Sequence, residues 1–240
     1  MYEPRLYRNR MLAQGLSSFE VSVKETDLLI CASHDLADVA YDLVNRCRGE
    51  LESFIDTHRI FVDTFTPIEV PDSAPEIVKS MVHAARLAGV GPMAAVAGAI
   101  AEYVGTGLLE YSDEIIIENG GDIFIKTNVE RNIGIFAGDS PLSNKLAILV
   151  KPEDTPLAVC TSSGTVGHSV SFGKADAVII MASSGALADA TATKVGNLVQ
   201  TKDDIKKAIE YAQDIPGIEG VIVIIGDSLG GWGKFEFLPV

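Results

Sequence analysis

Residues 114–127 have the sequence EIIIENGGDIFIKT, two short apolar runs joined by Asn119-Gly120-Gly121-Asp122. Isoleucine and phenylalanine favour strands. Asn-Gly between two apolar runs is a strong hairpin signal, because glycine adopts the positive φ of a tight turn at no steric cost. This stretch predicts an antiparallel strand pair, and successive strands of this kind favour an α+β fold over a doubly wound one.

The sequence on both sides of this hairpin predicts further strands, together with helices. On the N-terminal side the patterns predict a further hairpin at 16–32 and helices at 35–58, 77–87 and 92–104. On the C-terminal side they predict strands at 133–137, 145–150, 156–161, 177–182, 221–226 and 235–238, with helices at 185–199 and 203–212. No repeat or linker divides the chain, so we expect one domain, residues 1–240, of largely antiparallel sheets flanked by helices.

The chain is acidic, with a net charge of −14 from 33 acidic and 19 basic residues. This charge repels phosphates and anionic lipids, so we expect neither nucleic acid nor a membrane as a partner. The N-terminal sequence lacks the apolar segment of a signal peptide, and no apolar run reaches the roughly 18–20 residues of a membrane span. Cys31, Cys47 and Cys160 show no CxxC spacing and predict reduced thiols in a cytoplasmic protein.

Three short segments carry candidate functional residues, and the turn at 119–122 is the first. A tight hairpin explains these residues by itself. Alternatively, Gly120 and Gly121 let the backbone approach a ligand closely, while Asn119 and Asp122 provide polar contacts. Both interpretations stay open, because a turn can serve both purposes.

The second segment is Thr161-Ser162-Ser163-Gly164, which follows a predicted strand and precedes His168. Amides and hydroxyls beside a glycine can surround a phosphate, although a polar turn explains the same residues. The spacing is neither that of a Walker loop nor that of a nucleophile elbow. His168 lies among hydroxyls and titrates near neutral pH, which makes it a candidate general base.

The third segment is a predicted helix that contains Asp189-Ala190-Thr191-Ala192-Thr193. Asp189 and Thr193 are four residues apart and therefore share one helix face. A carboxylate and a hydroxyl are hard oxygen donors of the kind that Mg²⁺ accepts. A solvated polar stripe, continued by Asn197 and Gln200, is the alternative.

In this order, the three segments resemble motifs of the ApbE family of Mg²⁺-dependent flavin transferases. Members of that family carry an Asn-x-Gly-Gly-Asp-type turn, a Thr-Ser-Gly loop with a histidine after it, and an Asp-Ala-x-x-Thr helix. Here residues 119–122, 161–164 with His168, and 189–193 match these motifs. The stretch 161–178 is more similar to an unexported archaeal and bacterial branch than to the transferases themselves.

This resemblance implies an ApbE-like fold that binds FAD, places Mg²⁺ on its pyrophosphate, and transfers FMN to a Thr or Ser of a client protein. It implies that Asp189 and Thr193 bind Mg²⁺ and that His168 is the base toward the attacking hydroxyl. It also implies that 119–122 and 161–164 contact the dinucleotide. A cation and loop amides would let an acidic chain hold this anionic ligand.

Two elements of the transferases are absent from this chain. Residues 91–98, which correspond to their Ala-Lys-Gly element, contain no lysine, and residues 169–174 replace their Asp-Pro-Arg-x-Gly run. We therefore keep a second hypothesis, a non-catalytic relative that serves as a binding or accessory protein, with sulfur assimilation as the setting that the resemblance suggests. The apolar strand predicted at 235–238 also suggests pairing across a homodimer.

Overall fold

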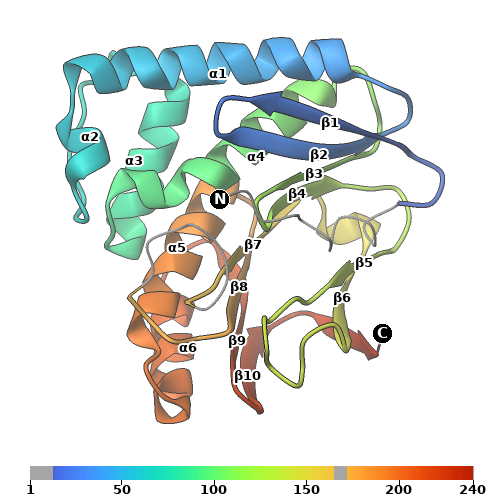
Figure 1. Ribbon diagram of the computed structural model, residues 1–240, viewed down its shortest axis with the longest axis vertical. Helices are drawn as coiled ribbons and strands as arrows, with labels where there is room; N and C mark the ends of the chain where they lie inside the picture. Colours follow the sequence, from blue (N-terminus) through green and yellow to red (C-terminus); the bar gives the residue numbers. More distant parts are fainter. Residues whose placement is uncertain (1–12, 165–171, 240) are drawn as a thin grey trace.

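The computed structural model describes residues 13–164 and 172–239. Its main element is an eight-stranded sheet with the strand order β1-β2-β3-β4-β7-β8-β9-β10, in which all neighbours are antiparallel (Figure 1). These strands are β1 (Ser17–Val23), β2 (Thr26–Ala32), β3 (Ile115–Asn119), β4 (Asp122–Lys126), β7 (Leu157–Ser162), β8 (Ala177–Ala182), β9 (Ile218–Ile225) and β10 (Ser228–Gly233). The antiparallel α+β class predicted from the sequence is confirmed.

A smaller antiparallel sheet with the order β11-β6-β5 lies against the large one. Its strands are β5 (Arg131–Gly134), β6 (Leu146–Val150) and β11 (Glu236–Pro239). The α-helices are α1 (Ala37–Thr57), α2 (Ile60–Asp63), α3 (Glu76–Ala88), α4 (Val96–Leu108), α5 (Gly185–Leu198) and α6 (Ile205–Gln213). Three short 3-10 helices complete the described elements: η2 (Pro92–Ala95) between α3 and α4, η3 (Pro152–Asp154) between β6 and β7, and η4 (Lys202–Asp204) before α6.

The large sheet is apolar on both faces, and each face supports a separate core. Successive side chains of a strand point to opposite faces. Cys160 and Ile180 therefore belong to the core under the helices, while Val159 and Ile179 belong to the core between the two sheets. Figure 1 shows the helices gathered on one side of the large sheet and β5 and β6 on the other.

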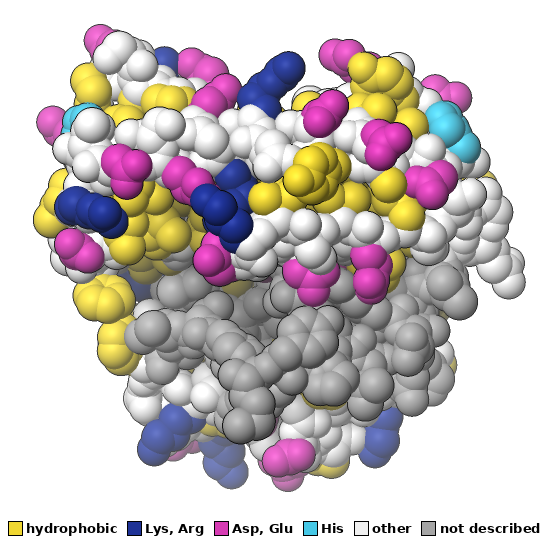
Figure 2. All heavy atoms as spheres, turned by 45° about the horizontal axis from the view of Figure 1, so that its top comes forward, with side chains coloured by type: hydrophobic (Ala, Val, Ile, Leu, Met, Phe, Trp, Pro, Cys, Tyr) yellow, Lys and Arg dark blue, Asp and Glu magenta, His cyan; other side chains and the backbone are white. Residues whose placement is uncertain are grey.

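The acidic composition appears at the surface. Figure 2 shows Asp and Glu side chains spread over the face that α1 covers, with Lys and Arg side chains between them. The exclusion of nucleic acid and membranes as partners stays a prediction. Within 13–164 and 172–239, no single helix is long and apolar enough to cross a membrane, and one bent pair, Glu76–Ala88 with Pro92–Leu108, meets the criterion by length and composition only. The cytoplasmic location also stays a prediction.

One predicted strand differs in position from the structure, and one observed strand was not predicted. The strand expected at 133–137 is β5 at Arg131–Gly134, and β10 was not predicted at all. The sequence of β10, SLGGWG, lacks the branched residues that favour strands. Packing explains its glycines, because a Cβ on Gly230 would lie 2.4 Å from Cγ2 of Ile205, and one on Gly231 would lie 3.0 Å from Phe235.

The C-terminal strand has a partner within its own chain. β11 pairs with β6, with Phe237 opposite Ile148 and Leu238 opposite Ala147. One edge of β11 is therefore occupied without a second protomer, and the homodimer stays a prediction.

Candidate functional site

The turn between β3 and β4 is a two-residue loop of Gly120 and Gly121, closed by Asn119 opposite Asp122. Gly120 has φ +69° and Gly121 has φ +105°, which side-chain-bearing residues rarely adopt. The Gly121 amide donates to Glu118 Oε1 at 2.8 Å. The hairpin prediction is confirmed, and glycine is required at both loop positions for conformational reasons.

The Asp122 side chain points into the same region as Asp189 of α5, although 67 positions separate them in the chain. Asp122 is buried and its Oδ1 accepts a hydrogen bond from the Thr161 amide at 3.2 Å. Burial and then the neighbouring charge of Asp189 raise the pKa of Asp122 well above its usual value. The pKa of Asp189 rises to about 7, chiefly because water is excluded from it. Two carboxylates thus share a water-poor environment.

The start of α4 holds the Asp189 side chain. Oδ2 of Asp189 accepts hydrogen bonds from the amides of Ala97 at 3.1 Å and Gly98 at 3.0 Å. These amides lie in the first turn of α4 and have no partner within that helix, so Asp189 acts as a helix cap supplied by another helix. Asn119 Nδ2 donates to the carbonyl of the same Ala97 at 3.0 Å. The 119–122 turn and Asp189 are therefore tied to one short backbone segment.

Glu102 of α4 makes the reciprocal contact with the start of α5. Its Oε2 accepts a hydrogen bond from the Gly185 amide at 2.8 Å and one from Ser184 Oγ at 3.3 Å. Each helix thus places a carboxylate at the positive end of the other helix dipole. This exchange fixes the α4–α5 crossing, which in turn positions Asp189.

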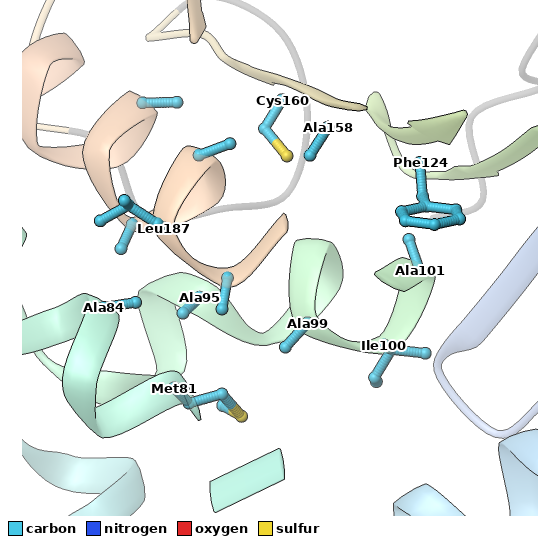
Figure 3. Close-up of a cluster of buried hydrophobic side chains, with 14 of the residues drawn as sticks. Met81, Ala84, Ala95, Ala99, Ile100, Ala101, Phe124, Ala158, Cys160 and Leu187 are labelled. Atoms are coloured by element: carbon cyan, nitrogen blue, oxygen red, sulfur yellow. The ribbon is translucent and has the colours of Figure 1, made fainter. Parts of the chain in front are cut away.

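Glycine and alanine allow this crossing to be close. A Cβ on Gly98 would lie 2.2 Å from the carbonyl oxygen of Gly185, and a Cβ on Gly185 would lie 2.4 Å from that of Gly98. Figure 3 shows the small side chains of Ala95 in η2 and Ala99 in α4 close to α5, with Cys160 pointing toward the helices from β7. The small residues of α4 thus allow tight packing against α5, and the amides of Ala97 and Gly98 also reach the candidate site.

The end of β7 completes the same region. Thr161 provides the amide that binds Asp122, and its carbonyl would lie 3.8 Å from a Cβ added to Gly121. Ser162 lies beside α5, because its Oγ would be 3.5 Å from a Cβ added to Gly196. Gly164 donates its amide to the carbonyl of Ala175 at 2.9 Å, which places Ser163 and Gly164 directly beyond the strand.

The three cysteines are buried free thiols, as predicted. Cys160 lies among the acidic groups of the site. Burial raises the pKa of its thiol well above the usual value, and the charges of Asp122 and Asp189 add to the effect. A thiol with a raised pKa is a weak nucleophile, so Cys160 acts here as a small core residue.

His168, the predicted catalytic base, lies outside the described residues, together with the remainder of 165–171. The segment that follows is anchored to α5. The Phe172 amide donates to Asn197 Oδ1 at 2.7 Å, and Gln200 Nε2 donates to the Phe172 carbonyl at 2.8 Å. Asn197 and Gln200, considered as a solvated continuation of the Asp189 stripe, instead hold this segment.

The candidate donors for a cation are Asp189 and Thr193, four residues apart on α5, and the Asp122 carboxylate, whose pKa the charge of Asp189 raises. All three provide hard oxygen atoms, and a divalent cation would offset the charge that two water-poor carboxylates otherwise place together. Within the described part of the chain, no three His, Cys, Asp or Glu side chains form a metal-binding cluster. Hard oxygen donors are of the kind that Mg²⁺ accepts while it keeps several of its waters.

The sequence analysis did not assign Ala97, Gly98 or Glu102 to the site. Ala97 and Gly98 contribute through backbone amides, which carry no residue-specific signal. Glu102 acts through a contact with Gly185, 83 positions away. The small residues from Ala94 to Ala99, which allow close approach of another backbone, are the available sequence signal for this part of the chain.

Comparison with known proteins places the chain in a family. The family model described as "AbpE bacteria" matches residues 9–231. A UPF0280 protein of Methanococcus aeolicus is 42% identical over 221 residues, which cover 90% of this chain and 89% of that protein. A UPF0280 protein of Methanocaldococcus jannaschii is 41% identical over 224 residues, 91% of each chain.

Solved structures show the same fold at much lower identity. The apo form of the Pseudomonas stutzeri flavinyl transferase ApbE has a TM-score of 0.57 at 13% identity and covers 90% of this chain and 94% of its own. The ApbE protein of Thermotoga maritima has a TM-score of 0.56 at 14% identity, with 91% and 97% covered. At this identity the similarity establishes the fold alone. From the family match and the UPF0280 relatives, we conclude that this chain belongs to the AbpE bacteria family and has an ApbE-like fold.

Proposed function

We propose that this chain binds a flavin dinucleotide or a similar phosphorylated ligand with Mg²⁺, where the 119–122 turn, the end of β7 and α5 meet, and that it transfers FMN from FAD to a Thr or Ser of a client protein. The proximity of the Asp122 and Asp189 carboxylates is the observation that carries the proposal. Burial raises the pKa of both, and each is a potential ligand for a hard cation. Two buried carboxyl groups with raised pKa values in one region are a candidate functional site.

Different residues of the chain would bind the cation and the phosphates. Asp189, held by the Ala97 and Gly98 amides, and Thr193 would bind Mg²⁺, with Asp122 adjacent. Thr161, Ser162, Ser163 and Gly164 would donate hydroxyl and amide hydrogen bonds to phosphate oxygens. When bound, Mg²⁺ would neutralise pyrophosphate charge as phosphorus is attacked.

The other two assignments concern the turn and the histidine. Asn119 and Asp122 would flank the ligand, and Gly120 and Gly121 would leave room for it. His168 would accept the proton of the attacking client hydroxyl.

The second candidate function is binding without transfer, in an accessory protein. It is favoured by the start of α4, where the segment that carries a lysine in the transferases offers only backbone amides, and two of these already hold Asp189. A site with its cation donors intact and this cationic side chain missing would still hold a nucleotide. The connection to sulfur assimilation stays a prediction from resemblance.

Titration of the purified chain with FAD, with and without Mg²⁺, tests the proposal, with AMP release and flavin labelling of client peptides as further readouts. Mg²⁺-dependent binding with AMP release supports transfer, and binding alone supports the accessory function. No FAD or FMN binding at tens of micromolar would contradict both.

Asp189→Asn tests the metal assignment. The amide keeps an oxygen that accepts hydrogen bonds from Ala97 and Gly98 but has no charge to offer a cation. We expect this variant to lose the Mg²⁺ dependence of FAD binding, while Asp42→Asn, which removes an exposed carboxylate of α1, keeps it. Equal Mg²⁺ dependence in the two variants would exclude Asp189 as a ligand.

A further inference from the structure

Two phenylalanine rings are exposed together beside α5. Phe65 is 67% exposed and Phe172 is 61% exposed, and their centroids lie 5.8 Å apart at an interplanar angle of 74°. Each ring would gain about 1.5–3 kcal/mol by full burial, so a solvent-exposed aromatic pair needs an explanation. An edge-to-face pair leaves ring surface available to a third planar group.

Phe172 is fixed in place through its backbone. Asn197 Oδ1 accepts a hydrogen bond from its amide at 2.7 Å, and Gln200 Nε2 donates to its carbonyl at 2.8 Å. The next residue, Gly173, approaches α5 so closely that a Cβ there would lie 1.8 Å from the Gly196 carbonyl oxygen. The chain thus holds an exposed ring at a defined position on the C-terminal end of α5.

Phe65 is fixed from the other side by the segment before η2. The Thr64 carbonyl oxygen would lie 2.0 Å from a Cβ on Gly91, and Cα of Phe65 would lie 3.1 Å from it. Thr64 Oγ1 also accepts a hydrogen bond from the Thr66 amide at 3.1 Å, which stiffens the loop. The two rings therefore reach one another from independent supports.

The two segments that hold the rings, α5 and the segment from Gly91 to Gly98, also contact or carry Asp189. Asp189, Thr193 and Asn197 recur every four residues and lie along one side of α5, and the eight-residue step from Asp189 to Asn197 corresponds to about 12 Å. On the facing segment, Gly91 lies against Phe65 and Gly98 lies against Asp189, with η2 between them. The rings and the carboxylate thus occupy two ends of one continuous strip.

We propose that Phe65 and Phe172 form a subsite for the planar aromatic ring of a nucleotide whose phosphates lie at Asp189 and Thr193. This inference rests on the function proposed above and adds the specificity of the site, because it selects ligands that carry both a ring and a phosphate. An aromatic surface binds a flat ring through its face and requires no specific hydrogen bonds.

The test compares ligands with and without a ring. Affinities of FAD, FMN, ADP and inorganic pyrophosphate, all with Mg²⁺, are measured by calorimetry for the wild type and for Phe65→Ala, Phe172→Ala and Phe172→Tyr. Tyr41→Ala, which removes an exposed ring of α1, is the matched control. The loss of one stacking partner weakens binding by roughly 5- to 100-fold.

The expected result is a loss of this size for ring-bearing ligands in both alanine variants, with pyrophosphate affinity unchanged. Phe172→Tyr and Tyr41→Ala should match the wild type. A loss for FMN and FAD identifies the flavin as the ring in the subsite, whereas a loss for ADP and FAD identifies the adenine.

Several results would overturn the inference. Unchanged FAD affinity in both alanine variants would remove the subsite and leave the proposed function standing. Unchanged affinity with reduced client labelling would assign the rings to client contact instead. Equal losses for FAD and pyrophosphate would indicate a general disturbance of the site, and a wild type that binds none of the four ligands would overturn the proposed function together with the subsite.

Discussion

A single methyl group at Gly98 should separate the two helices that build the site. In Gly98→Ala, the added Cβ would lie 2.2 Å from the Gly185 carbonyl oxygen, 2.8 Å from the Gly185 carbonyl carbon and 2.8 Å from Cβ of Asp189. Two of these atoms belong to the backbone of α5 and cannot rotate away. The helices must therefore move apart, and the Ala97 and Gly98 amides move with α4 away from Asp189.

The change in the free energy of unfolding of Gly98→Ala follows from two opposing effects. Replacing glycine by alanine inside a helix stabilises it by about 0.8–1 kcal/mol. Inserting a methyl group into a filled space costs about 1–3 kcal/mol, and the upper end applies here because the neighbours are backbone atoms. We expect a net loss of about 1–2 kcal/mol in the free energy of unfolding, which lowers Tm by roughly 2–8 °C for a chain of this size.

Gly49→Ala is the matched control. Gly49 lies within α1, is exposed, and would have no atom within 4 Å of an added Cβ. The same helix-propensity gain then acts without a clash, so this variant should be more stable than the wild type by about 0.5–1 kcal/mol. The two variants should therefore differ by about 2–3 kcal/mol in urea unfolding.

The outcome that refutes this reasoning is equal stabilisation of the two variants. It would mean that the α4–α5 crossing has room for a methyl group and does not set the position of Asp189. If the crossing is tight, the affinity for FAD with Mg²⁺ should also fall in Gly98→Ala and remain unchanged in Gly49→Ala.

Three further predictions concern the same region. The pKa of Asp189 is about 7 in the folded state, which is above its value in the unfolded state. Between about pH 4 and pH 7 the folded state therefore retains a proton that the unfolded state has lost. The free energy of unfolding of the metal-free protein should fall as pH rises through this range. The contribution of Asp189 between pH 5 and pH 8 is on the order of 1–3 kcal/mol. Asp189→Asn should therefore reduce the slope of the measured stability-versus-pH profile, while Asp122, whose pKa is also raised, keeps a slope of the same sign. A slope equal to that of the wild type would contradict this origin. Glu102→Ala removes the acceptor for the Gly185 amide and Ser184 Oγ. It should lower the free energy of unfolding, measured by chemical denaturation, by about 1–3 kcal/mol, and Glu102→Gln should recover part of this loss. An alanine variant as stable as the wild type would exclude Glu102 as a helix cap. Gly121→Ala meets no close atom but retains φ +105°, so a loss of about 1–3 kcal/mol from backbone strain is expected, and thermal unfolding unchanged from wild type would show that the turn can rearrange.

Much of the fold was accessible from the sequence because its signals are local. Alternating or continuous apolar runs predicted β3, β4, β7 and β8, and glycines at 120 and 121 predicted the turn that joins the first two strands. Strand β10 was missed for an equally physical reason. Gly230 and Gly231 disfavour a strand, and contacts with Ile205 and Phe235 outweigh that preference only after the chain has folded.

In the candidate site, too, some residues could be selected from local sequence signals and others only from contacts in the folded chain. Its motif residues Asn119, Asp122, Asp189 and Thr193 could be selected by type and spacing. The structure places Asp189 close enough to Asp122 for its charge to raise the pKa of Asp122. Ala97 and Glu102 could not be selected, because their contributions are an amide orientation and a contact between helices.

The sequence by itself determined which chemical groups were present: hard oxygen donors on one helix face, a glycine turn between apolar strands, and a hydroxyl-rich loop. Only the tertiary structure decided that Asp189 is held by the start of α4, that Glu102 holds the start of α5, and that Phe65 meets Phe172. The reason is physical. Turn and helix preferences depend on neighbours along the chain, whereas the burial that raises the pKa of Asp189 depends on segments that approach only when the apolar cores form.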